Sequence, residues 1–377
     1  MKQISILGST GSIGRQTLEV VRRHSDKFKI VALAGHSNVD LLEAQVKEFK
    51  PEVVGISDEK IYAREKHRFS GLTVLSGADA LIEVAGLNKA DIMVAAVSGM
   101  AGFLSTLKAV ECGKTVALAN KESLVAGGKI IKETAKKTGA KIYPVDSEHS
   151  AVWQCLEGNN SRSLQKIILT ASGGPLYGKG SEELKNTTIE QALAHPTWSM
   201  GKKISLDSAT MGNKALEILE ASVLFDTHNI DYVIHPESIV HSIVEFTDGT
   251  HIMQASPPSM IYPIGLALSY PDRIDNDKMP FAFNKPLNFL PKDEINFPLP
   301  KLAKQALKTH EGAPLVFNAS LEAVDYLFLN KTIGFGHISI IVAKILEEVD
   351  FPTLNTAEDV VKAHNEVYEK VLAEYNK

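Results

Sequence analysis

The chain has few cysteines, no long apolar run and no large excess of charge of one sign. Its two cysteines, Cys112 and Cys155, are too few for a disulfide framework, which suits a reducing compartment. No apolar run approaches the roughly 20 residues needed to span a bilayer, and no signal-peptide core follows Met1. The formal net charge of −5 gives no bulk attraction for nucleic acid or for an anionic membrane. We therefore expect a soluble cytoplasmic protein that binds neither.

The composition is that of a folded globular chain, because 44% of the residues are hydrophobic and 23% are charged. At 377 residues a single core has usually stopped growing, so we expect two or three domains. Short apolar stretches alternate with amphipathic ones as far as residue 145, which is typical of βαβ units around a parallel sheet. The predicted fold is α/β, with an N-terminal Rossmann-type domain (1–145), a central α+β catalytic domain (146–270), a linker (271–300) and a C-terminal helical domain (301–377).

Individual elements can also be predicted. In the first domain strands are expected at residues 4–7, 30–34, 53–56, 92–97, 116–119 and 142–145, and in the second at 166–170 and 238–246. Near the end of the chain, Thr356 and Asp359 have the spacing of a capping box ahead of apolar residues at helical spacing. A final helix is therefore expected to begin there.

A glycine-rich turn follows the first expected strand and precedes an amphipathic stretch. Gly8, Gly11 and Gly14 lie in it with the spacing GxxGxxG rather than the usual GxGxxG. A dinucleotide-binding turn needs glycine for a left-handed backbone and for close approach of a pyrophosphate to a helix N-terminus. A glycine turn without a ligand is the alternative, but the flanking strand and helix favour a nucleotide. The residues expected to contact it here are Thr10, Gly11, Ser12 and Ile13.

The residues after the second strand favour NADP over NAD. An NAD-specific site usually has Asp or Glu there to hold the ribose 2′-hydroxyl. This chain has Gly35, His36, Ser37 and Asn38, with no Arg or Lys among them. A carboxylate would repel a 2′-phosphate, whereas Ser, Asn and a partly charged His can hydrogen-bond to it. We therefore predict that Gly35, Ser37 and Asn38 contact NADPH.

Acidic residues at two places suggest a metal site. Asp146 and Glu148 follow an expected strand, and in an extended chain residues two apart point the same way. If the later segment is helical, Asn213, Lys214 and Glu217 share one face. Three carboxylates without a cysteine describe a hard oxygen site for Mg²⁺ or Mn²⁺. Solvated surface acids are the alternative that spacing alone leaves open.

Six motifs in one order carry a resemblance that extends from the first residue to the last. They are GSTGSIG (8–14), LANKESLV (118–125), PVDSEHSA (144–151), TASGGP (170–175), HPTWSMGKKIS (195–205) and DSATMGNKALE (207–217). The chain thereby resembles the 1-deoxy-D-xylulose 5-phosphate reductoisomerase family. The resemblance implies a homodimeric enzyme that rearranges this phosphosugar and reduces it with NADPH to 2-C-methyl-D-erythritol 4-phosphate, a step in isoprenoid synthesis.

The resemblance also assigns the catalytic centre. It implies that Asp146, Glu148 and Glu217 hold the divalent metal, Mn²⁺ or Mg²⁺ with Co²⁺ as a further candidate. Such an ion polarises the ketone and orients the hydroxyls of the substrate. Lys121 would contact a substrate hydroxyl near the metal, although an exposed lysine is the ordinary alternative. The residues implied as catalytic are Lys121, Glu148 and His195.

Further residues are implied to surround the substrate and the cofactor. The phosphate pocket would comprise Ser172, Ser208, Asn213 and Lys214, and Ser147 would help to hold the substrate. Asn120 and Glu122 would contact the nicotinamide side of NADPH, and Gly201 would contact the cofactor as well. For the serines a cap or turn role is the alternative, and Ser208 lies where it would precede a helix.

A loop is implied to close over the substrate. His195, Trp198 and Met200 lie on it, and His195 would donate a hydrogen bond to the substrate or its phosphate. The segment from Gly173 to His195 is long, charged and rich in glycine, as a lid would be. Closure would exclude water before hydride transfer. A role in the core is the alternative for Trp198.

The sequence departs from the family pattern at several positions. Gly212 stands where the family often has Met, Ala215 where it usually has Gly, and Thr197 where it has Asn. Residues 257–261 are PPSMI where the family commonly has Pro-Asp-Met-Arg, and residues 318–322 are NASLE in place of Asn-Ala-Ala-Asn-Glu. None of these changes removes an expected ligand, but the last two bear on the lid-facing wall or on an interface.

Two other functions stay open from the sequence. One is a metal-dependent sugar-phosphate isomerase or aldolase that uses no nicotinamide, and the intact glycine turn argues against it. The other is a non-catalytic nucleotide-binding regulator. The retained Asp146, Glu148 and Glu217, together with Lys121 and Lys214, argue against a regulator.

Overall fold

The computed structural model describes residues 1–196, 198, 201–276 and 284–376. By their contacts these residues form two compact units. The first unit comprises residues 1–123 and 129–150 and a later segment that starts at Ser259; the second comprises residues 124–128 and 151–258 and the chain beyond that segment. Helices α6 (Lys121–Thr138) and α7 (Ser147–Leu156) each carry residues of both units. No helix in the described ranges is long and apolar enough to cross a membrane.

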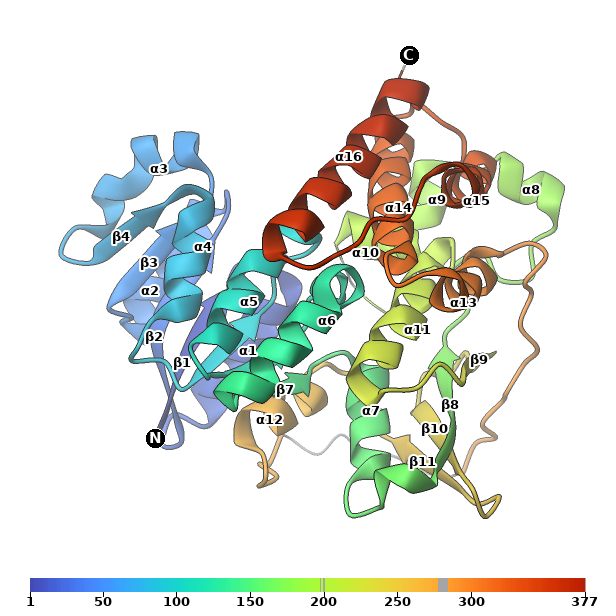
Figure 1. Cartoon of the computed structure of the whole chain (residues 1–377). Coiled ribbons are helices and arrows are strands. Elements are labelled where there is room, and N and C mark those ends of the chain that lie inside the picture. The colour runs from blue at the N-terminus through green and yellow to red at the C-terminus, as the bar shows by residue number, and fades with distance from the viewer. Residues whose placement is uncertain (197, 199–200, 277–283, 377) are drawn as a thin grey trace. The chain divides into compact units, whose positions relative to one another are not determined.

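The first unit is built on a seven-stranded sheet in the order β4-β3-β2-β1-β5-β6-β7, in which every pairing is parallel (Figure 1). The strands are β1 (Lys2–Leu7), β2 (Phe28–Gly35), β3 (Val53–Ile56), β4 (Thr73–Ser76), β5 (Ile92–Ala95), β6 (Thr115–Leu118) and β7 (Lys141–Pro144). The middle strands are almost continuously apolar because helices cover both faces of the sheet. The strand order reverses between β1 and β5, which is where sheets of this kind bind their ligands.

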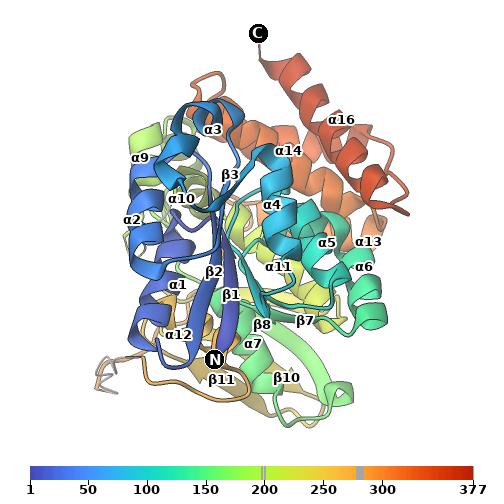
Figure 2. The same ribbon diagram turned by 90° about the vertical axis from the view of Figure 1, so that its left-hand side faces the viewer.

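Helices lie on both faces of this sheet (Figure 2). They are α1 (Ser12–Arg23), α2 (Val39–Phe49), α3 (Glu59–Glu65), α4 (Gly77–Gly86), α5 (Phe103–Glu111), α6 and α12 (Ile261–Ser269), with short 3₁₀ turns η1 (Lys66–Phe69) and η2 (Met100–Gly102). Figure 2 shows α1, α2 and α12 on one face and α4 and α5 on the other. The parallel sheet and its covering helices confirm the predicted Rossmann-type fold.

Helix α12 completes the first unit although it comes late in the chain. Its residues Ile264 and Leu268 lie in the same hydrophobic core as Ile4 and Ile30 of the sheet. At its end the Lys2 ammonium donates hydrogen bonds to the carbonyl oxygens of Leu268 (3.0 Å) and Tyr270 (3.1 Å). By its contacts α12 belongs to the first unit, while the sequence places it within the stretch 146–270 of the central domain.

The second unit combines a four-stranded sheet with most of the remaining helices. The sheet order is β11-β10-β8-β9, where β8 and β9 are parallel and the other pairs are antiparallel. Its strands are β8 (Leu164–Ala171), β9 (Ile230–Ile234), β10 (Val240–Phe246) and β11 (His251–Ala255). Its helices are α8 (Ser181–Lys185), α9 (Ile189–Leu193), α10 (Lys202–Ala209), α11 (Gly212–Phe225), α13 (Leu299–Thr309), α14 (Ala313–Leu329), α15 (Ile338–Glu348) and α16 (Ala357–Tyr375), with 3₁₀ turns η3 (Ser161–Ser163) and η4 (Phe335–His337).

The sheet of the second unit and the C-terminal helices share one hydrophobic core. Buried Ile167 and Leu169 of β8 belong to the same cluster as Phe317 and Val324 of α14. The predicted linker also packs onto the sheet: Leu290 pairs with Ile234 of β9 through backbone hydrogen bonds. The α+β and helical regions expected from the sequence are therefore present and are continuous in their packing.

All eight expected strands are present, and three further strands were not predicted. The unpredicted strands β4, β9 and β11 are each at the edge of a sheet. An edge strand buries less of its surface, so its apolar pattern is weak; every residue of β11, for example, is exposed or half-exposed. The expected capping box is confirmed, since Thr356 caps α16 and accepts a hydrogen bond from the Asp359 amide (3.1 Å).

Candidate active site

The glycine-rich turn joins β1 to α1 at the point where the strand order reverses. Gly8 has a left-handed backbone (φ +78°), and a Cβ added there would lie 2.8 Å from the Ala96 carbonyl carbon after β5. A Cβ added to Gly14 would lie 2.5 Å from Ser9 Cα. Only glycine fits at these two positions. Gly11 precedes α1 without a side-chain cap, so the N-terminus of α1 is open to an anionic group.

Gln45 of α2, which no sequence motif indicates, is hydrogen-bonded to this turn. Gln45 of α2 is 5% exposed, and its amide nitrogen donates a hydrogen bond to the Ser9 carbonyl oxygen (2.9 Å). The amides of Gly8 and Ser9 both donate to the Ala34 carbonyl at 2.9 Å, which ties the turn to the end of β2. Gln45 lies far from the turn in sequence and carries no motif, so only the folded helix could identify it.

The four residues expected to select NADP lie just beyond β2. Gly35 is beside the glycine turn, because a Cβ added to it would lie 3.4 Å from Thr10 Cγ2. His36 and Ser37 are exposed. The His36 imidazole Nδ1 is 3.0 Å from the Ser57 hydroxyl, and the Asn38 side-chain oxygen caps α2 by accepting from the Leu41 amide (3.2 Å). The exposed Ser37 is therefore adjacent to the expected nucleotide turn, whereas Asn38 also has a structural role.

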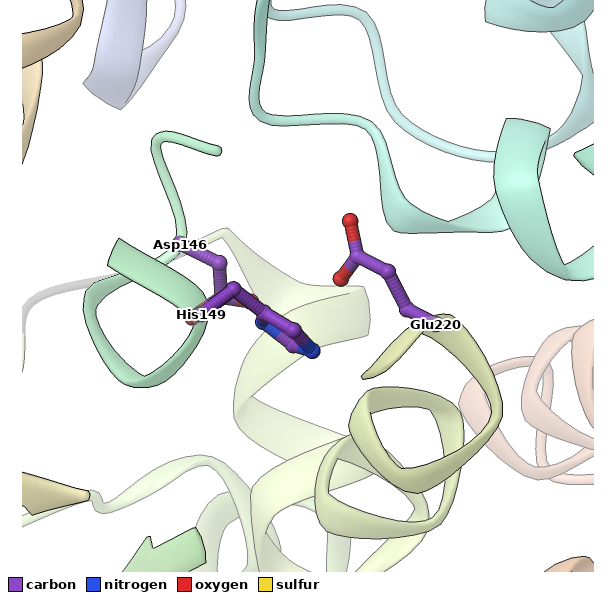
Figure 3. A group of neighbouring side chains, drawn as sticks. All are labelled: Asp146, His149 and Glu220. Carbon is purple, nitrogen blue, oxygen red and sulfur yellow. The ribbon is translucent and has the colours of Figure 1, made fainter. Parts of the chain in front are cut away.

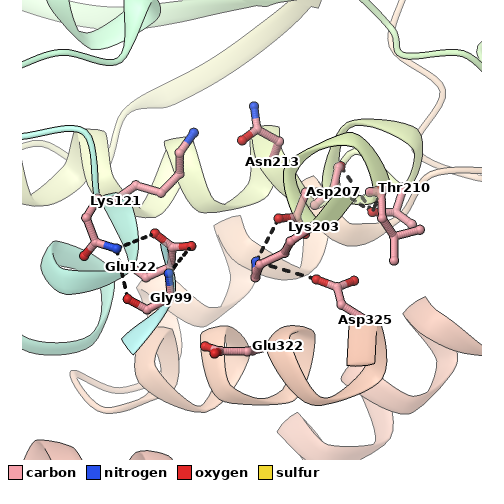
Figure 4. Close-up of polar contacts among 12 residues, drawn as sticks. Gly99, Lys121, Glu122, Lys203, Asp207, Thr210, Asn213, Glu322 and Asp325 are labelled. Carbon is pink, nitrogen blue, oxygen red and sulfur yellow. Dashed lines mark hydrogen bonds and ion pairs between the residues drawn. The ribbon is translucent and has the colours of Figure 1, made fainter. Parts of the chain in front are cut away.

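Asn120 and Glu122 form a buried polar network after β6. Asn120 is 1% exposed and caps α6, and its amide nitrogen donates to the carbonyl oxygens of Val97 (2.7 Å) and Gly99 (2.9 Å). Glu122 accepts hydrogen bonds from the Gly99 amide (3.1 Å) and from Asn120 (3.1 Å) (Figure 4). These contacts shape the loop after β5, beside the strand-order switch. The prediction that both residues contact the nicotinamide stays a prediction.

Two residues from separate motifs meet at the carboxyl edge of the first sheet. The Lys121 ammonium lies 2.5 Å from Asp146 Oδ2. The pairing of β6 with β7 accounts for this, because Leu118 and Pro144 are register partners at the ends of these parallel strands. The side chains that follow each strand therefore emerge together. Lys121 is 9% exposed, so the alternative of a freely solvated lysine does not apply.

The chain at Asp146 to His149 is helical and not extended, which corrects the geometry assumed from the sequence. Helix α7 begins at Ser147, and the Ser150 amide donates to the Asp146 carbonyl oxygen (2.9 Å). Glu148 therefore lies in the first helical turn, where the Ser147 hydroxyl donates to its carboxylate (2.6 Å). The helix also brings the buried His149 imidazole to 4.0 Å from Asp146 (Figure 3). Asp146 and Glu148, two residues apart at the start of this helix, still offer carboxylate oxygens within 4.8 Å of one another, so the candidate ligand pair survives the correction.

The predicted helical face on α11 is confirmed. The Asn213 amide donates to Glu217 Oε1 (2.5 Å), and the Lys214 ammonium pairs with Glu217 Oε2. Glu217 is fully buried and Lys214 is 3% exposed, so neither is a solvated surface charge. A positive charge this close favours the ionised form of a carboxylate, which is the form that binds a metal.

Two predicted substrate residues, Ser172 and His195, also come together within the second unit. The His195 Nε2 lies 3.2 Å from the Ser172 hydroxyl. Its Nδ1 accepts a hydrogen bond from the Trp198 amide (2.9 Å), so the neutral ring carries its proton on Nε2. Burial lowers the pKa of His195 below its ordinary value, which favours this neutral form. His195 is thus prepared to donate a hydrogen bond from Nε2.

Ser208 lies near the end of α10, which corrects the expectation that it precedes a helix. The residue that precedes α11 is Met211, with a left-handed backbone (φ +61°). A Cβ added to Gly174 would lie 2.5 Å from the Ser208 carbonyl oxygen, so the loop that carries Ser172 packs directly on this end of α10. The expected lid segment contains α8 and α9, and Gly201 precedes α10. Met200 and Thr197 lie outside the described residues.

Two of the departures from the family pattern meet in the second unit. A Cβ added to Gly212 would lie 3.1 Å from Leu321 Cδ2 and 3.0 Å from the Thr210 hydroxyl. Leu321 is fully buried. Leucine at 321 is larger than the asparagine of the family pattern. It therefore fills the space that the methionine of the family pattern would need at 212. The two changes compensate one another in the packing of α11 on α14.

The fold and this turn define a class of protein. A doubly wound parallel sheet, with a glycine-rich turn where the strand order reverses, belongs to the Rossmann-type dinucleotide-binding proteins. Family models match three stretches of the chain: 1-deoxy-D-xylulose 5-phosphate reductoisomerase over residues 4–128, and the two C-terminal domains of this enzyme over 142–225 and 255–370. The chain belongs to the 1-deoxy-D-xylulose 5-phosphate reductoisomerase family, which confirms the resemblance carried by the six motifs.

Curated relatives and solved structures agree with this assignment. The 1-deoxy-D-xylulose 5-phosphate reductoisomerase of Thermodesulfovibrio yellowstonii is 45% identical over 367 residues, covering 96% of each chain. That of Lachnoclostridium phytofermentans is 46% identical over 376 residues, covering 98% of this chain and 97% of its own. A crystal structure of DOX-P reductoisomerase with NADPH, fosmidomycin and magnesium has a TM-score of 0.93 at 39% identity, and covers 100% of this chain and 98% of its own. The enzyme from Zymomonas mobilis in complex with NADPH has a TM-score of 0.92 at 38% identity, with 99% of each chain covered.

Proposed function

We propose that this chain catalyses the rearrangement and reduction of 1-deoxy-D-xylulose 5-phosphate to 2-C-methyl-D-erythritol 4-phosphate, using NADPH and a divalent metal, in the synthesis of isoprenoid precursors. Family membership over the whole chain supports the reaction, and related structures hold NADPH and magnesium. The observation that carries the proposal is the Lys121–Asp146 pair at the carboxyl edge of the first sheet. It joins two of the six family motifs at the edge of the sheet where proteins of this kind bind their ligands.

The residues proposed to hold the metal are Asp146, Glu148 and Glu217. Each offers a carboxylate oxygen, and a set of oxygen donors suits Mg²⁺ or Mn²⁺, with Co²⁺ also accepted. The buried state of Glu217 and its pairing with Lys214 fit a ligand better than a surface acid. When bound, the metal supplies a Lewis acid for the ketone and hydroxyl oxygens of the substrate.

The polypeptide is proposed to bind and orient the phosphosugar. Lys121 would hold a substrate hydroxyl with its buried ammonium, and Ser147 would assist from the start of α7. The Ser172 and Ser208 hydroxyls would bind the phosphate together with the Asn213 amide and the Lys214 ammonium, because hydroxyl and amide donors with one fixed positive charge suit a phosphate. Neutral His195 would donate from Nε2 to the same substrate.

The cofactor is proposed to lie over the strand-order switch. Its pyrophosphate would face the open N-terminus of α1, where Thr10, Gly11, Ser12 and Ile13 lie. The 2′-phosphate would meet Gly35, Ser37 and Asn38. Asn120 and Glu122 would shape the nicotinamide end, and Gly201 would contact the cofactor from the segment before α10.

Several features beyond the reaction are part of the proposal. Residues 1–145 would bind NADPH, 146–270 would carry the catalytic residues, and 271–300 would connect these to the helices of 301–377. The segment with His195 and Trp198 would close over the bound substrate and exclude water. The enzyme would work as a homodimer in the cytoplasm.

One assay tests the reaction against both alternatives. Purified protein, 1-deoxy-D-xylulose 5-phosphate, NADPH and Mn²⁺ are mixed, and the loss of NADPH absorbance is followed with a metal-free control. The proposal expects metal-dependent NADPH oxidation and formation of the methylerythritol phosphate. An isomerase without a nicotinamide would consume the sugar while NADPH stays constant. A non-catalytic regulator would consume neither, and either of these results would overturn the proposal.

The cofactor preference can be inverted at one exposed position. Replacing Ser37 by Asp is expected to lower kcat/KM with NADPH and to raise kcat/KM with NADH relative to it, because a carboxylate repels a 2′-phosphate and can accept from a 2′-hydroxyl. The ratio of kcat/KM for the two cofactors should shift by more than about tenfold, the factor that corresponds to 1.4 kcal/mol. Ser37→Asn, which adds bulk without charge, is the matched control. An unchanged ratio would mean that the 2′-phosphate is recognised elsewhere.

A further inference from the structure

A buried ionic group links α10 to α14 inside the second unit. The Lys203 ammonium lies 2.8 Å from Asp207 Oδ2 on the same helix and 3.6 Å from Asp325 Oδ2 on α14 (Figure 4). The side chains of Asp207 and Asp325 are only 3% and 2% exposed, and that of Lys203 is 23% exposed. Two carboxyl groups and one ammonium therefore lie together where water has little access.

The charges of this group balance only if one carboxyl group keeps a proton. An ionised carboxylate accepts hydrogen bonds and donates none. Among the described residues, neither Asp325 oxygen has a hydrogen-bond partner, and Asp207 Oδ1 has none either. The two carboxyl groups face the same Lys203 ammonium, and they can hydrogen-bond to one another only if one of them is protonated. Two buried carboxylates against one ammonium would also be expensive in free energy.

The distances distinguish the two carboxyl groups. The Lys203 ammonium is nearer to Asp207 (2.8 Å) than to Asp325 (3.6 Å), so Asp325 receives less stabilisation from its positive charge. Burial and the Asp207 charge raise the pKa of Asp325 well above its usual range, and Glu322 on the same helix acts in the same direction, while Lys203 opposes them. From α16, the His364 imidazole lies 3.4 Å from Glu322.

This ionic group adjoins the residues that the proposed function assigns to binding the substrate phosphate. Asp207 directly precedes Ser208, and the loop with Ser172 packs on the Ser208 carbonyl through Gly174. A Cβ added to Gly212 would lie 3.3 Å from Asp207 Oδ1, so the start of α11, with Asn213 and Lys214, adjoins the same carboxyl group. A shift of α10 against α14 would therefore move the phosphate donors together.

We infer that Asp325 is a positioning residue that, as a neutral acid, hydrogen-bonds Asp207 and fixes α10 on α14, thereby setting the geometry of the phosphate pocket. The inference rests on the proposed function for its effect on the substrate, while the proton on Asp325 does not depend on it. Asp325 touches no reacting atom. Its contribution would appear in binding of the phosphate end of the substrate and not in NADPH binding.

Asparagine and alanine at position 325 separate this role from simple packing. Asp325→Asn keeps the shape and supplies an N–H donor to Asp207, so kcat and both KM values should stay within about twofold of wild type. Asp325→Ala removes the donor and should raise KM for 1-deoxy-D-xylulose 5-phosphate on the order of tenfold to a hundredfold, as a misplaced binding group does. Its NADPH dissociation constant, measured by fluorescence, should not change. Asp207→Asn removes the charge that Lys203 needs and should be worse tolerated than Asp325→Asn.

Ser320→Ala is the matched control for lost stability. Ser320 is another buried polar residue of α14, and its hydroxyl is bonded within the helix to the Val316 carbonyl oxygen (2.7 Å). It should lower thermal stability without a selective change of KM. If Asp325→Ala raised KM for sugar and cofactor equally, or if Asp325→Asn failed as badly as Asp325→Ala, the inference would be wrong.

Two measurements without substrate keep the inference separate from the proposed reaction. The infrared difference spectrum of wild type minus Asp325→Asn at neutral pH should contain the C=O stretch of a protonated carboxylic acid, and its absence would overturn the assignment. The folded chain also holds a proton that the unfolded chain releases above the ordinary Asp range, so wild-type unfolding free energy falls as pH rises toward the raised pKa of Asp325. Asp325→Asn should lack this loss. A wild type with both signatures but no reductoisomerase activity would refute the proposed function alone.

Discussion

Replacing Glu217 by glutamine is expected to lower metal-dependent turnover by more than about 100-fold, since even groups that only support metal ligands are worth 10- to 100-fold. Glutamine keeps an oxygen for the Asn213 amide but cannot offer a negative charge to a divalent ion or to Lys214. The apparent Mn²⁺ affinity, measured from the metal dependence of NADPH oxidation, should fall in parallel. NADPH binding should stay near the wild-type value, because the expected nucleotide residues lie around the glycine turn.

The control for Glu217→Gln is the same change at a carboxylate that also pairs with a lysine. Glu294 is 2.8 Å from Lys304, and both are partly exposed. Glu294→Gln should leave turnover and metal affinity nearly unchanged, since such exposed pairs contribute at most about 1 kcal/mol to stability. A collapse of NADPH binding in Glu217→Gln would contradict the separation of metal and cofactor sites. Full turnover in that variant would remove Glu217 from the ligand set.

The second large effect is expected at the glycine turn, where alanine in place of Gly14 should destabilise the protein by about 3 kcal/mol or more. The added Cβ would lie 2.5 Å from Ser9 Cα and 2.7 Å from Ser9 C. These are backbone atoms, which cannot move aside by a change of side-chain rotamer. Alanine is better than glycine in a helix by only about 1 kcal/mol, so the clash outweighs this gain. The turn must open, and NADPH affinity should fall by more than about tenfold.

Gly11→Ala provides the comparison within the same turn. Its Cβ would have a single close neighbour, the Gly8 carbonyl oxygen at 3.3 Å, and Gly11 has an extended backbone (φ −76°) that alanine can adopt. Loss of a favourable residue before α1 should cost about 1 kcal/mol or less. Chemical denaturation and NADPH fluorescence titration measure both variants. Equal damage from Gly11→Ala and Gly14→Ala would show that the clash at Gly14 is not the cause.

The fold was largely predictable because buried parallel strands are continuous apolar segments. The strands at 30–34 and 92–97 could be found from composition alone, since both of their faces are covered. Edge strands such as β11 lack this signal. The membership of α12 in the first unit depends on contacts between residues more than 200 positions apart, such as Lys2 with Leu268, which no local pattern contains.

The candidate site was predictable where chemistry and spacing coincide. Asn213, Lys214 and Glu217 could be placed on one face because the helical period fixes it. Lys121 and Asp146 required the pairing of two strands to bring them together. Gln45 and Asp325 act on site residues from other helices and have no motif of their own. Residues of that kind can be identified only from the folded structure.

The late position of α12 has a consequence for how this protein is made. When the ribosome has synthesised the seven strands of the first sheet, the face that α12 covers is still bare, and Lys2 lacks the carbonyl groups that it binds in the finished fold. The helix is translated only after the strands of the second sheet. The amino-terminal unit therefore cannot mature first, as domains made in sequence order commonly do. Nascent chains would keep this apolar surface exposed for more than a hundred codons beyond β7, and transient exposure of this kind is what chaperones protect against.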